Sequence, residues 1–161
     1  MTTAQTTATQ DVDSDDEMQQ WATFQLSEEL YGINVMQVME VLRLTEIAPV
    51  PGSQQFILGI INLRGNVITV VDTRTLFGLP RGGETESSRI IVIELADQVV
   101  GMLVDQVAEV IYLRKSAIEQ APNVGSDDTA RFIQGVSYHN DTLITLLDLD
   151  RMIDDDDQAE G

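Results

Sequence analysis

The chain has 161 residues, 43% of them hydrophobic, which suffices for one domain or for two small subdomains that share a core. Its formal net charge of −18 argues against binding to nucleic acid or to anionic membrane surfaces, because both favour basic patches. The absence of cysteine excludes disulfides and thiolate metal sites and suits a reducing compartment.

The two ends of the chain carry much of the negative charge. Residues 11–17 include five acidic residues and no basic one, and residues 154–160 include five more acidic residues. We therefore expect a disordered acidic tail over residues 1–20, a folded domain over 21–153 and a second acidic tail over 154–161. The N-terminus does not resemble a secretion signal, and no apolar run reaches the roughly 20 residues of a membrane helix. We expect a cytoplasmic protein without direct membrane insertion.

The first half of the chain is predicted to hold two pairs of strands. Residues 22–26 and 31–35 have strand-like patterns on either side of a polar turn. Apolar residues then recur at helical spacing over residues 36–42, which predicts one or two turns of helix. Residues 56–71 form two apolar runs around a polar tip at residues 62–66, a pattern typical of a β-hairpin.

The second half is predicted to continue with short strands and polar loops. Residues 79–88 and 121–130 have the composition of loops. The β-rich runs cover residues 90–95, 99–104, 107–113, 132–136 and 143–147. A short helix is expected over residues 148–153. Many short strands with Gly-rich turns and only stub helices predict an all-β fold of small barrels.

The sequence contains an internal duplication. A shift of 76 positions places Phe56-Ile57-Leu58-Gly59-Ile60 on Phe132-Ile133-Gln134-Gly135-Val136, and a shift of 69 aligns the earlier parts, including Gly32 with Gly101 and Val38 with Val107. We interpret the chain as two copies of a unit of roughly 70 residues that form two similar barrels. Equivalent glycines predict a shared backbone requirement, such as a bulge or a close strand approach. Features present in one copy only are the functional candidates.

Two aspartates occupy matching positions in the copies. Asp72 and Asp148 suggest a pseudo-symmetric hydrolase, but an aspartic-protease dyad needs an Asp-Thr/Ser-Gly turn that holds the carboxylates about 3 Å apart. Neither aspartate is followed by that glycine. The favoured interpretation is that each caps the N-terminus of a short helix.

Other catalytic signals are weak. His139 is the single histidine and lies at a predicted hairpin tip, where an exposed polar residue is ordinary. The glycines of Arg81-Gly82-Gly83 lack the Gly-Lys-Ser/Thr of a phosphate-binding loop. We therefore expect no catalytic residue, no metal site and no cofactor.

Arg64 lies at the tip of the hairpin over residues 56–71, and its counterpart in the second copy is Asn140, so the cationic tip is predicted in one copy only. Glu40 is interpreted as similarly one-sided, because its counterpart Glu109 falls in a predicted strand. Two interpretations stay open. Arg64 and Glu40 either anchor an interface or are solvated surface residues.

An ordered set of short motifs extends from about Phe24 to Ile153. The first copy contains Tyr31-Gly32-Ile33, Val38-Met39-Glu40-Val41, Asn62-Leu63-Arg64-Gly65 and Val70-Val71-Asp72-Thr73-Arg74. The second copy contains residues 99–105, then Val107, Val110 and Ala121-Pro122, and finally residues 132–136 and 143–148. Together these motifs resemble the CheW family of bacterial chemotaxis coupling proteins.

The resemblance implies an all-β fold with short helices, made of two pseudo-duplicated, intertwined five-stranded SH3-like barrels. It also implies a non-enzymatic adaptor of two-component signalling, which joins the cytoplasmic tips of chemoreceptors (methyl-accepting chemotaxis proteins) to the regulatory domain of the histidine kinase CheA in membrane-associated arrays. The positions that match the family's docking surface are Val38, Glu40, Gly59, Arg64, Gly101, Val107 and Val110.

Three alternatives remain beside this interpretation. The chain could be a CheW-like adaptor of another chemosensory pathway, or a regulatory module detached from a kinase, which has the same fold. The third alternative is the hydrolase built on Asp72 and Asp148.

Overall fold

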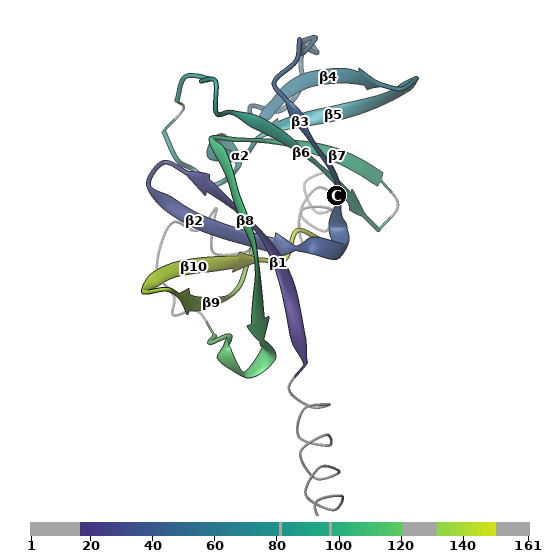
Figure 1. Cartoon of the computed structure of the whole chain (residues 1–161). Coiled ribbons are helices and arrows are strands. Elements are labelled where there is room, and N and C mark those ends of the chain that lie inside the picture. Colours follow the sequence, from purple (N-terminus) through teal and green to yellow (C-terminus); the bar gives the residue numbers. More distant parts are fainter. Residues whose placement is uncertain (1–16, 81, 97, 121–131, 151–161) are drawn as a thin grey trace, which may run out of the picture.

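The computed structural model describes residues 17–80, 82–96, 98–120 and 132–150, most of which lie in β-strands (Figure 1). The first copy contributes β1 (Met18–Leu26), β2 (Glu29–Asn34), β3 (Val38–Arg43), β4 (Ile57–Leu63) and β5 (Asn66–Asp72). The second copy contributes β6 (Arg89–Leu95), β7 (Gln98–Val104), β8 (Gln106–Arg114), β9 (Ile133–His139) and β10 (Thr142–Leu147). The short helices are η1 (Val35–Gln37), α2 (Thr73–Leu76) and η2 (Lys115–Ala117). The predicted all-β fold is confirmed.

The strands form two five-stranded sheets in the described part of the chain. Sheet A has the order β8-β1-β2-β10-β9, and sheet B has the order β3-β6-β7-β5-β4. Each sheet therefore combines strands of both copies, because β1 and β2 join β8 to β10 whereas β6 and β7 join β3 to β5. The chain passes from sheet A to sheet B between β2 and β3, and returns between β7 and β8 (Figure 1). The two SH3-like barrels, which are not fully closed, are intertwined as the resemblance implied.

The strand registers reproduce the duplication found in the sequence. In the parallel pair of β5 and β7, Val70 lies opposite Gly101, and in the parallel pair of β10 and β2, Leu146 lies opposite Gly32. The two pairs are related by the same shifts of 76 and 69 positions. The copies are thus equivalent in backbone pairing as well as in sequence.

Three hydrophobic clusters hold the molecule together. Sheet A encloses Trp21, Ile111, Leu113, Ile144 and Leu146, and sheet B encloses Ile61, Ile68, Val70, Ile90 and Val92. A third and larger cluster takes residues from both sheets, and within it Phe24, Tyr31, Phe77 and Phe132 form a chain of ring contacts with centroids 5.5 to 5.9 Å apart. Because both barrels pack on this shared core, their relative position is fixed by apolar burial.

The helix predicted over residues 36–42 is wrong. Residues Val35–Gln37 form a single 3-10 turn, capped by the Asn34 side chain, which accepts a hydrogen bond from Met36 N, and Val38–Arg43 form the edge strand β3. Burial alternates along β3, with the side chains of Val38, Glu40 and Leu42 less exposed than their neighbours. An apolar run this short fits either period, and pairing with β6 selects the strand.

The remaining predicted elements divide into two groups. The hairpins around residues 62–66 and 138–141 are confirmed, as is the extended run over 107–113. The predicted loop over 121–130, most of the terminal helix over 148–153 and both acidic tails lie outside the described residues.

Candidate functional site

The β4–β5 hairpin presents Arg64 on a rigid two-residue turn. Arg64 and Gly65 have φ angles of 50° and 87°, so both turn residues are left-handed, as in the type I′ turns that match the twist of paired strands. The Asn62 side chain accepts a hydrogen bond from Gly65 N at 3.0 Å. The turn therefore holds the arginine at a fixed place beyond the end of sheet B.

Arg64 forms an ion pair with Glu40 on the edge strand β3. Arg64 Nη1 lies 3.5 Å from Glu40 Oε1, and Arg64 Nη2 contacts Glu40 Oε2. The arginine side chain is 70% exposed, whereas that of Glu40 is 27% exposed. Exposed pairs of this kind contribute only about 0 to 1 kcal/mol to folding stability. The pair thus shapes the surface more than it stabilises the fold.

The three valines that match the docking surface fall into two environments. Val38 begins β3 opposite Ile93, and Val107 lies in β8 opposite Phe24, which are equivalent positions in the two copies. Both are half-buried and pack against the shared core. Val110 is 48% exposed on β8, so it is the valine of this set that is free to contact a partner.

The two glycines of the same set are required by packing. Gly59 has a φ angle of 150°, and a Cβ at this position would lie 2.1 Å from the carbonyl oxygen of Ala48, where the chain bridges Ala48 to Ile60. Gly101 is buried, and its Cβ would lie 2.9 Å from a methyl group of Ile90. Gly135 is the counterpart of Gly59, and a Cβ there would lie 2.7 Å from the carbonyl oxygen of Glu119, which confirms the predicted close strand approach in both copies.

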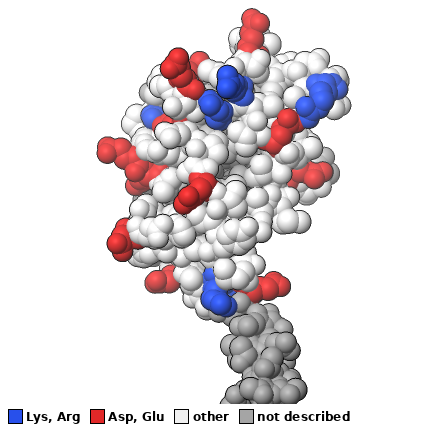
Figure 2. Space-filling model, viewed as in Figure 1, with Lys and Arg blue, Asp and Glu red and all other residues white. Residues whose placement is uncertain are grey.

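Exposed apolar residues that the sequence interpretation missed lie on the same edge strands. Met39 and Val41 on β3 are 53% and 45% exposed, and Tyr112 on β8 is 56% exposed. Figure 2 shows acidic groups spread over one face, with few basic groups and a wide uncharged area between them. The helical interpretation of residues 36–42 counted Met39 among the apolar residues at helical spacing and therefore did not predict this exposed strand edge.

The second copy carries a counterpart of the Glu40–Arg64 pair. Glu109 on β8 is the equivalent of Glu40, and its Oε2 lies 3.8 Å from Nε2 of His139 at the end of β9. The interpretation of Glu40 as one-sided is therefore wrong, since both glutamates lie on edge strands. What differs is the group that faces the glutamate, which is the guanidinium of Arg64 in the first copy and the imidazole of His139 in the second.

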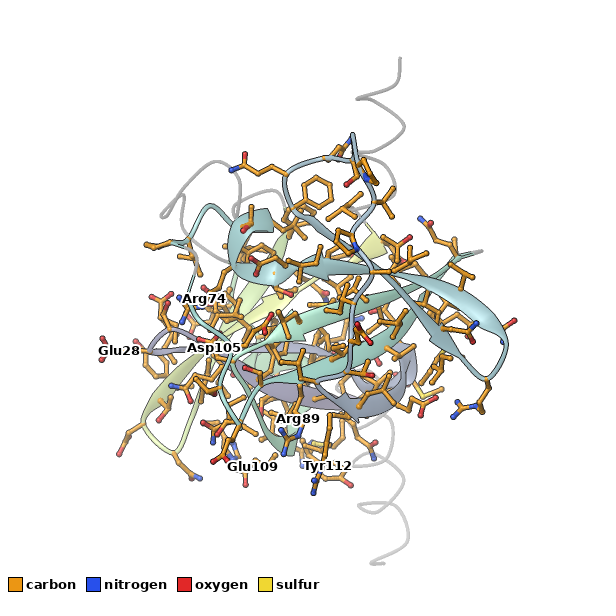
Figure 3. The ribbon with its side chains drawn as sticks, turned by 90° about the horizontal axis from the view of Figure 1, so that it is seen from above. Glu28, Arg74, Arg89, Asp105, Glu109 and Tyr112 are labelled. Carbon is orange, nitrogen blue, oxygen red and sulfur yellow. The ribbon has the colours of Figure 1, made fainter. Side chains whose placement is uncertain are left out.

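A second ion pair connects the two sheets. Arg74 on α2 binds Asp105, which lies between β7 and β8, and Asp105 also accepts a hydrogen bond from the backbone N–H of Ser27 at 2.7 Å (Figure 3). Partial burial acts to raise the pKa of Asp105, but the hydrogen bonds from Arg74 and Ser27 and the charge of Arg74 outweigh it and hold the pKa below its ordinary value. The hydrogen bond to Asp105 raises the pKa of Arg74.

Asp72 and Asp148 serve local turns. Asp72 occupies the N-cap position of α2, and its carboxylate accepts a hydrogen bond from the hydroxyl of Thr75 at 2.8 Å. Asp148 follows β10 in the other sheet and accepts a hydrogen bond from Asp150 N at 3.2 Å. Asp72 thus occupies the predicted N-cap position, although its side chain does not accept a capping hydrogen bond from the helix backbone. Each carboxylate is engaged beside its own strand end, unlike two carboxylates that share a proton.

The described residues hold neither a metal-binding cluster nor a membrane-spanning helix. Among residues 17–80, 82–96, 98–120 and 132–150, no group of three or more histidine, aspartate or glutamate side chains is arranged to hold a metal ion. Within the same ranges, no helix has both the length and the apolar character needed to cross a bilayer.

Comparison with known proteins identifies the family. The model of the CheW-like domain matches residues 20–157. Chemotaxis protein CheW of Bacillus subtilis is 34% identical over 131 residues, covering 81% of this chain and 84% of that protein, and CheW of Thermotoga maritima is 32% identical over 139 residues, covering 86% and 90%. The crystal structure of the scaffolding protein TtCheW from Thermoanaerobacter tengcongensis superposes with a TM-score of 0.77 at 38% identity, covering 83% of this chain and 90% of that one. With a family model matched over most of its length and several relatives above 30% identity, the chain belongs to the CheW family.

Proposed function

We propose that this protein is a non-enzymatic chemotaxis scaffold that couples the cytoplasmic tips of chemoreceptors to the regulatory domain of the histidine kinase CheA. Its relatives are named chemotaxis proteins, and a structural neighbour is named a scaffolding protein. We place it in the cytoplasm, recruited to membrane-associated receptor arrays.

The observation that carries this proposal is the exposed Glu40–Arg64 pair beside an exposed apolar strand edge. Met39 and Val41 on β3 supply apolar contact area, and Arg64 supplies a charged anchor at a fixed turn. Interfaces between proteins combine an apolar centre with a few polar anchors, among which arginine is enriched. A conformational change in a partner bound to one barrel would then reach a partner bound to the other barrel. The reason is that the two barrels share one core and move as a single body.

We divide the matched positions by their role in this proposal. Glu40, Arg64 and Val110 are exposed enough to contact a receptor or the kinase directly. Val38 and Val107 pack the edge strands against the shared core. Gly59 and Gly101 have no side chain and therefore allow neighbouring segments to approach closely. We retain the division into tails at 1–20 and 154–161 around a domain over 21–153 as part of the proposal.

The experiment is a co-purification of receptor fragments, CheA and this protein. Arg64→Ala is expected to reduce recovery of the three-component complex while the far-ultraviolet circular dichroism spectrum stays unchanged. Lys115→Ala, which removes an exposed positive charge from η2, is the matched control and should assemble normally. Normal assembly with Arg64→Ala, or equal loss with Lys115→Ala, would count against the proposal.

A further inference from the structure

The barrel of sheet A has an opening that is the counterpart of the Glu40–Arg64 site. We call it the second mouth, the space between the edge strand β8 and the β9–β10 turn, with a cavity of about 240 Å³. Its lining includes Thr23, Leu30, Glu109, His139, Asn140 and Thr142. The described structure gives this opening no role in the fold beyond the contact between Glu109 and His139.

The backbone of the second mouth matches that of the Glu40–Arg64 site, which we call the first mouth. Asn140 occupies the turn position of Arg64, and their φ angles are 53° and 50°. The hydroxyl of Thr23 donates to the Glu109 carbonyl oxygen where the register of β1 and β8 shifts, and Glu40 pairs with Val92 where the register of β3 and β6 shifts. The two glutamates therefore face equivalent turns from equivalent strands.

The two glutamates differ in what covers them. The side chain of Glu40 is 27% exposed and contacts the guanidinium of Arg64, whereas that of Glu109 is 69% exposed and, among the described side chains, lies 3.8 Å from His139. Among the described residues, Glu109 therefore lacks the guanidinium contact that its counterpart Glu40 has. The first mouth shows which group completes such a site, because there a guanidinium binds the glutamate from the turn.

We propose that Glu109 receives an arginine side chain from a partner protein, in the place that Arg64 takes within the chain at Glu40. A guanidinium is permanently charged and has several N–H donors in a plane, which suits a carboxylate with amide and hydroxyl acceptors around it. Asn140 and Thr142 line the second mouth and carry such acceptors. Figure 3 shows Glu109 at the rim of the molecule, on the same side as Tyr112 and away from Arg74 and Asp105, where a partner can reach it.

The charged side chains around the second mouth favour a cationic ligand. Glu109 lies on β8 at the mouth, and Asp141 lies in the turn between β9 and β10. Thr23 from β1 and Leu30 from β2 line the mouth behind them and carry no charge. The carboxylates therefore attract a guanidinium group.

The probe is N-acetylargininamide, added to the full-length ¹⁵N-labelled protein. We expect amide shift changes centred on residues 108–110 and 140–142. The neutral isostere N-acetylcitrullinamide and the ammonium compound N-acetyllysinamide should produce smaller changes. Equal changes with either compound would overturn the assignment to arginine.

Two variants test the site itself. Glu109→Gln should abolish the shift changes, and Asn140→Arg should abolish them as well, because an arginine at this turn position can pair with Glu109 within the chain. The φ angle of 53° is one that Arg64 already adopts, so the second variant fits the turn. Unchanged binding in Glu109→Gln or in Asn140→Arg would refute the proposal, as would a lack of shift changes in the wild type.

Discussion

Arg74 and Asp105 form a bidentate ion pair at the point where the chain passes from sheet B to sheet A. Arg74 Nε lies 2.9 Å from Oδ1 and 3.1 Å from Oδ2 of Asp105, and Asp105 N donates to the carbonyl oxygen of Gln25 on β1. The pair exists in one copy only, because the position equivalent to Arg74 is Asp150 and that equivalent to Asp105 is Met36. It therefore fixes one of the two crossovers.

Replacement of Arg74 should destabilise the fold. Arg74→Met keeps an apolar side chain but leaves the partly buried Asp105 carboxylate without its cation, so we expect a loss of about 1 to 3 kcal/mol in the free energy of unfolding. Urea titration followed by circular dichroism measures this loss. Arg64→Met is the matched control, with an expected loss below about 1 kcal/mol because its ion pair is exposed. Equal losses in the two variants would contradict the assignment.

The same pair predicts a dependence of stability on pH. Since the native pKa of Asp105 is lowered, its contribution is fully present above the unfolded-state pKa of about 3.9 and is lost as the pH falls through the native pKa. The difference in unfolding free energy between the wild type and Asp105→Asn should therefore be largest near neutral pH and shrink on acidification. Urea titrations of both proteins between about pH 7 and about pH 3 measure it. A difference that stays constant would exclude the carboxylate as its source.

Gly59→Ala should reduce stability because the new Cβ would overlap the Ala48 carbonyl oxygen in a backbone conformation unsuited to alanine. We expect a loss of about 2 to 4 kcal/mol, measured by thermal or urea unfolding. Gly83→Ala is the control, since a Cβ there meets no atom within 4 Å. A tolerated Gly59→Ala would show that the bridge between Ala48 and Ile60 is dispensable.

Replacing a core-packed valine should lower stability, whereas replacing the exposed Val110 should affect only partner binding. Val38→Ala removes methyl groups that pack on the shared core and should cost about 1 to 2 kcal/mol, whereas Val110→Ala should change stability by less than about 0.5 kcal/mol. If Val110 contacts a partner, its variant should weaken the three-component complex at full stability. Parallel unfolding and co-purification measurements distinguish the cases. A stable, fully assembling Val110→Ala would remove this residue from the docking surface.

The sequence predicted the strands well where local chemistry determines them. Gly65, Asn140 and Asp141 are residue types that tolerate the left-handed conformation, and Arg64 adopts it in the tight two-residue turn. Both hairpins form at these tips. The duplication by itself aligns these turns and the paired glycines. The duplication could not show that each sheet takes strands from both copies. A repeat shows which residues of the two copies correspond, but it does not show with which copy a given strand pairs.

The candidate site was predicted less completely. Val38 to Arg43 is apolar on both faces apart from Glu40 and Arg43, so its period is ambiguous until β6 provides a pairing partner. The ion pairs were also hidden, since Glu40 and Arg64 are separated by 24 positions and Glu109 and His139 by 30. The equivalence of Glu40 and Glu109 is visible in the alignment of the copies, and it is the signal that leads to the second mouth.

Because each sheet contains strands of both copies, the chain could be divided into two fragments that complete each other's sheets. A cut within residues 82–88 would leave one fragment with β1 to β5 and the other with β6 to β10, and neither fragment would contain a complete sheet. Each would expose strand edges and apolar faces that only the other can cover, so the fragments should reassemble as an obligate heterodimer. Because Glu40 and Arg64 belong to one fragment and Glu109 and His139 to the other, fragment complementation would let the two mouths be labelled or altered separately and then rejoined in one scaffold.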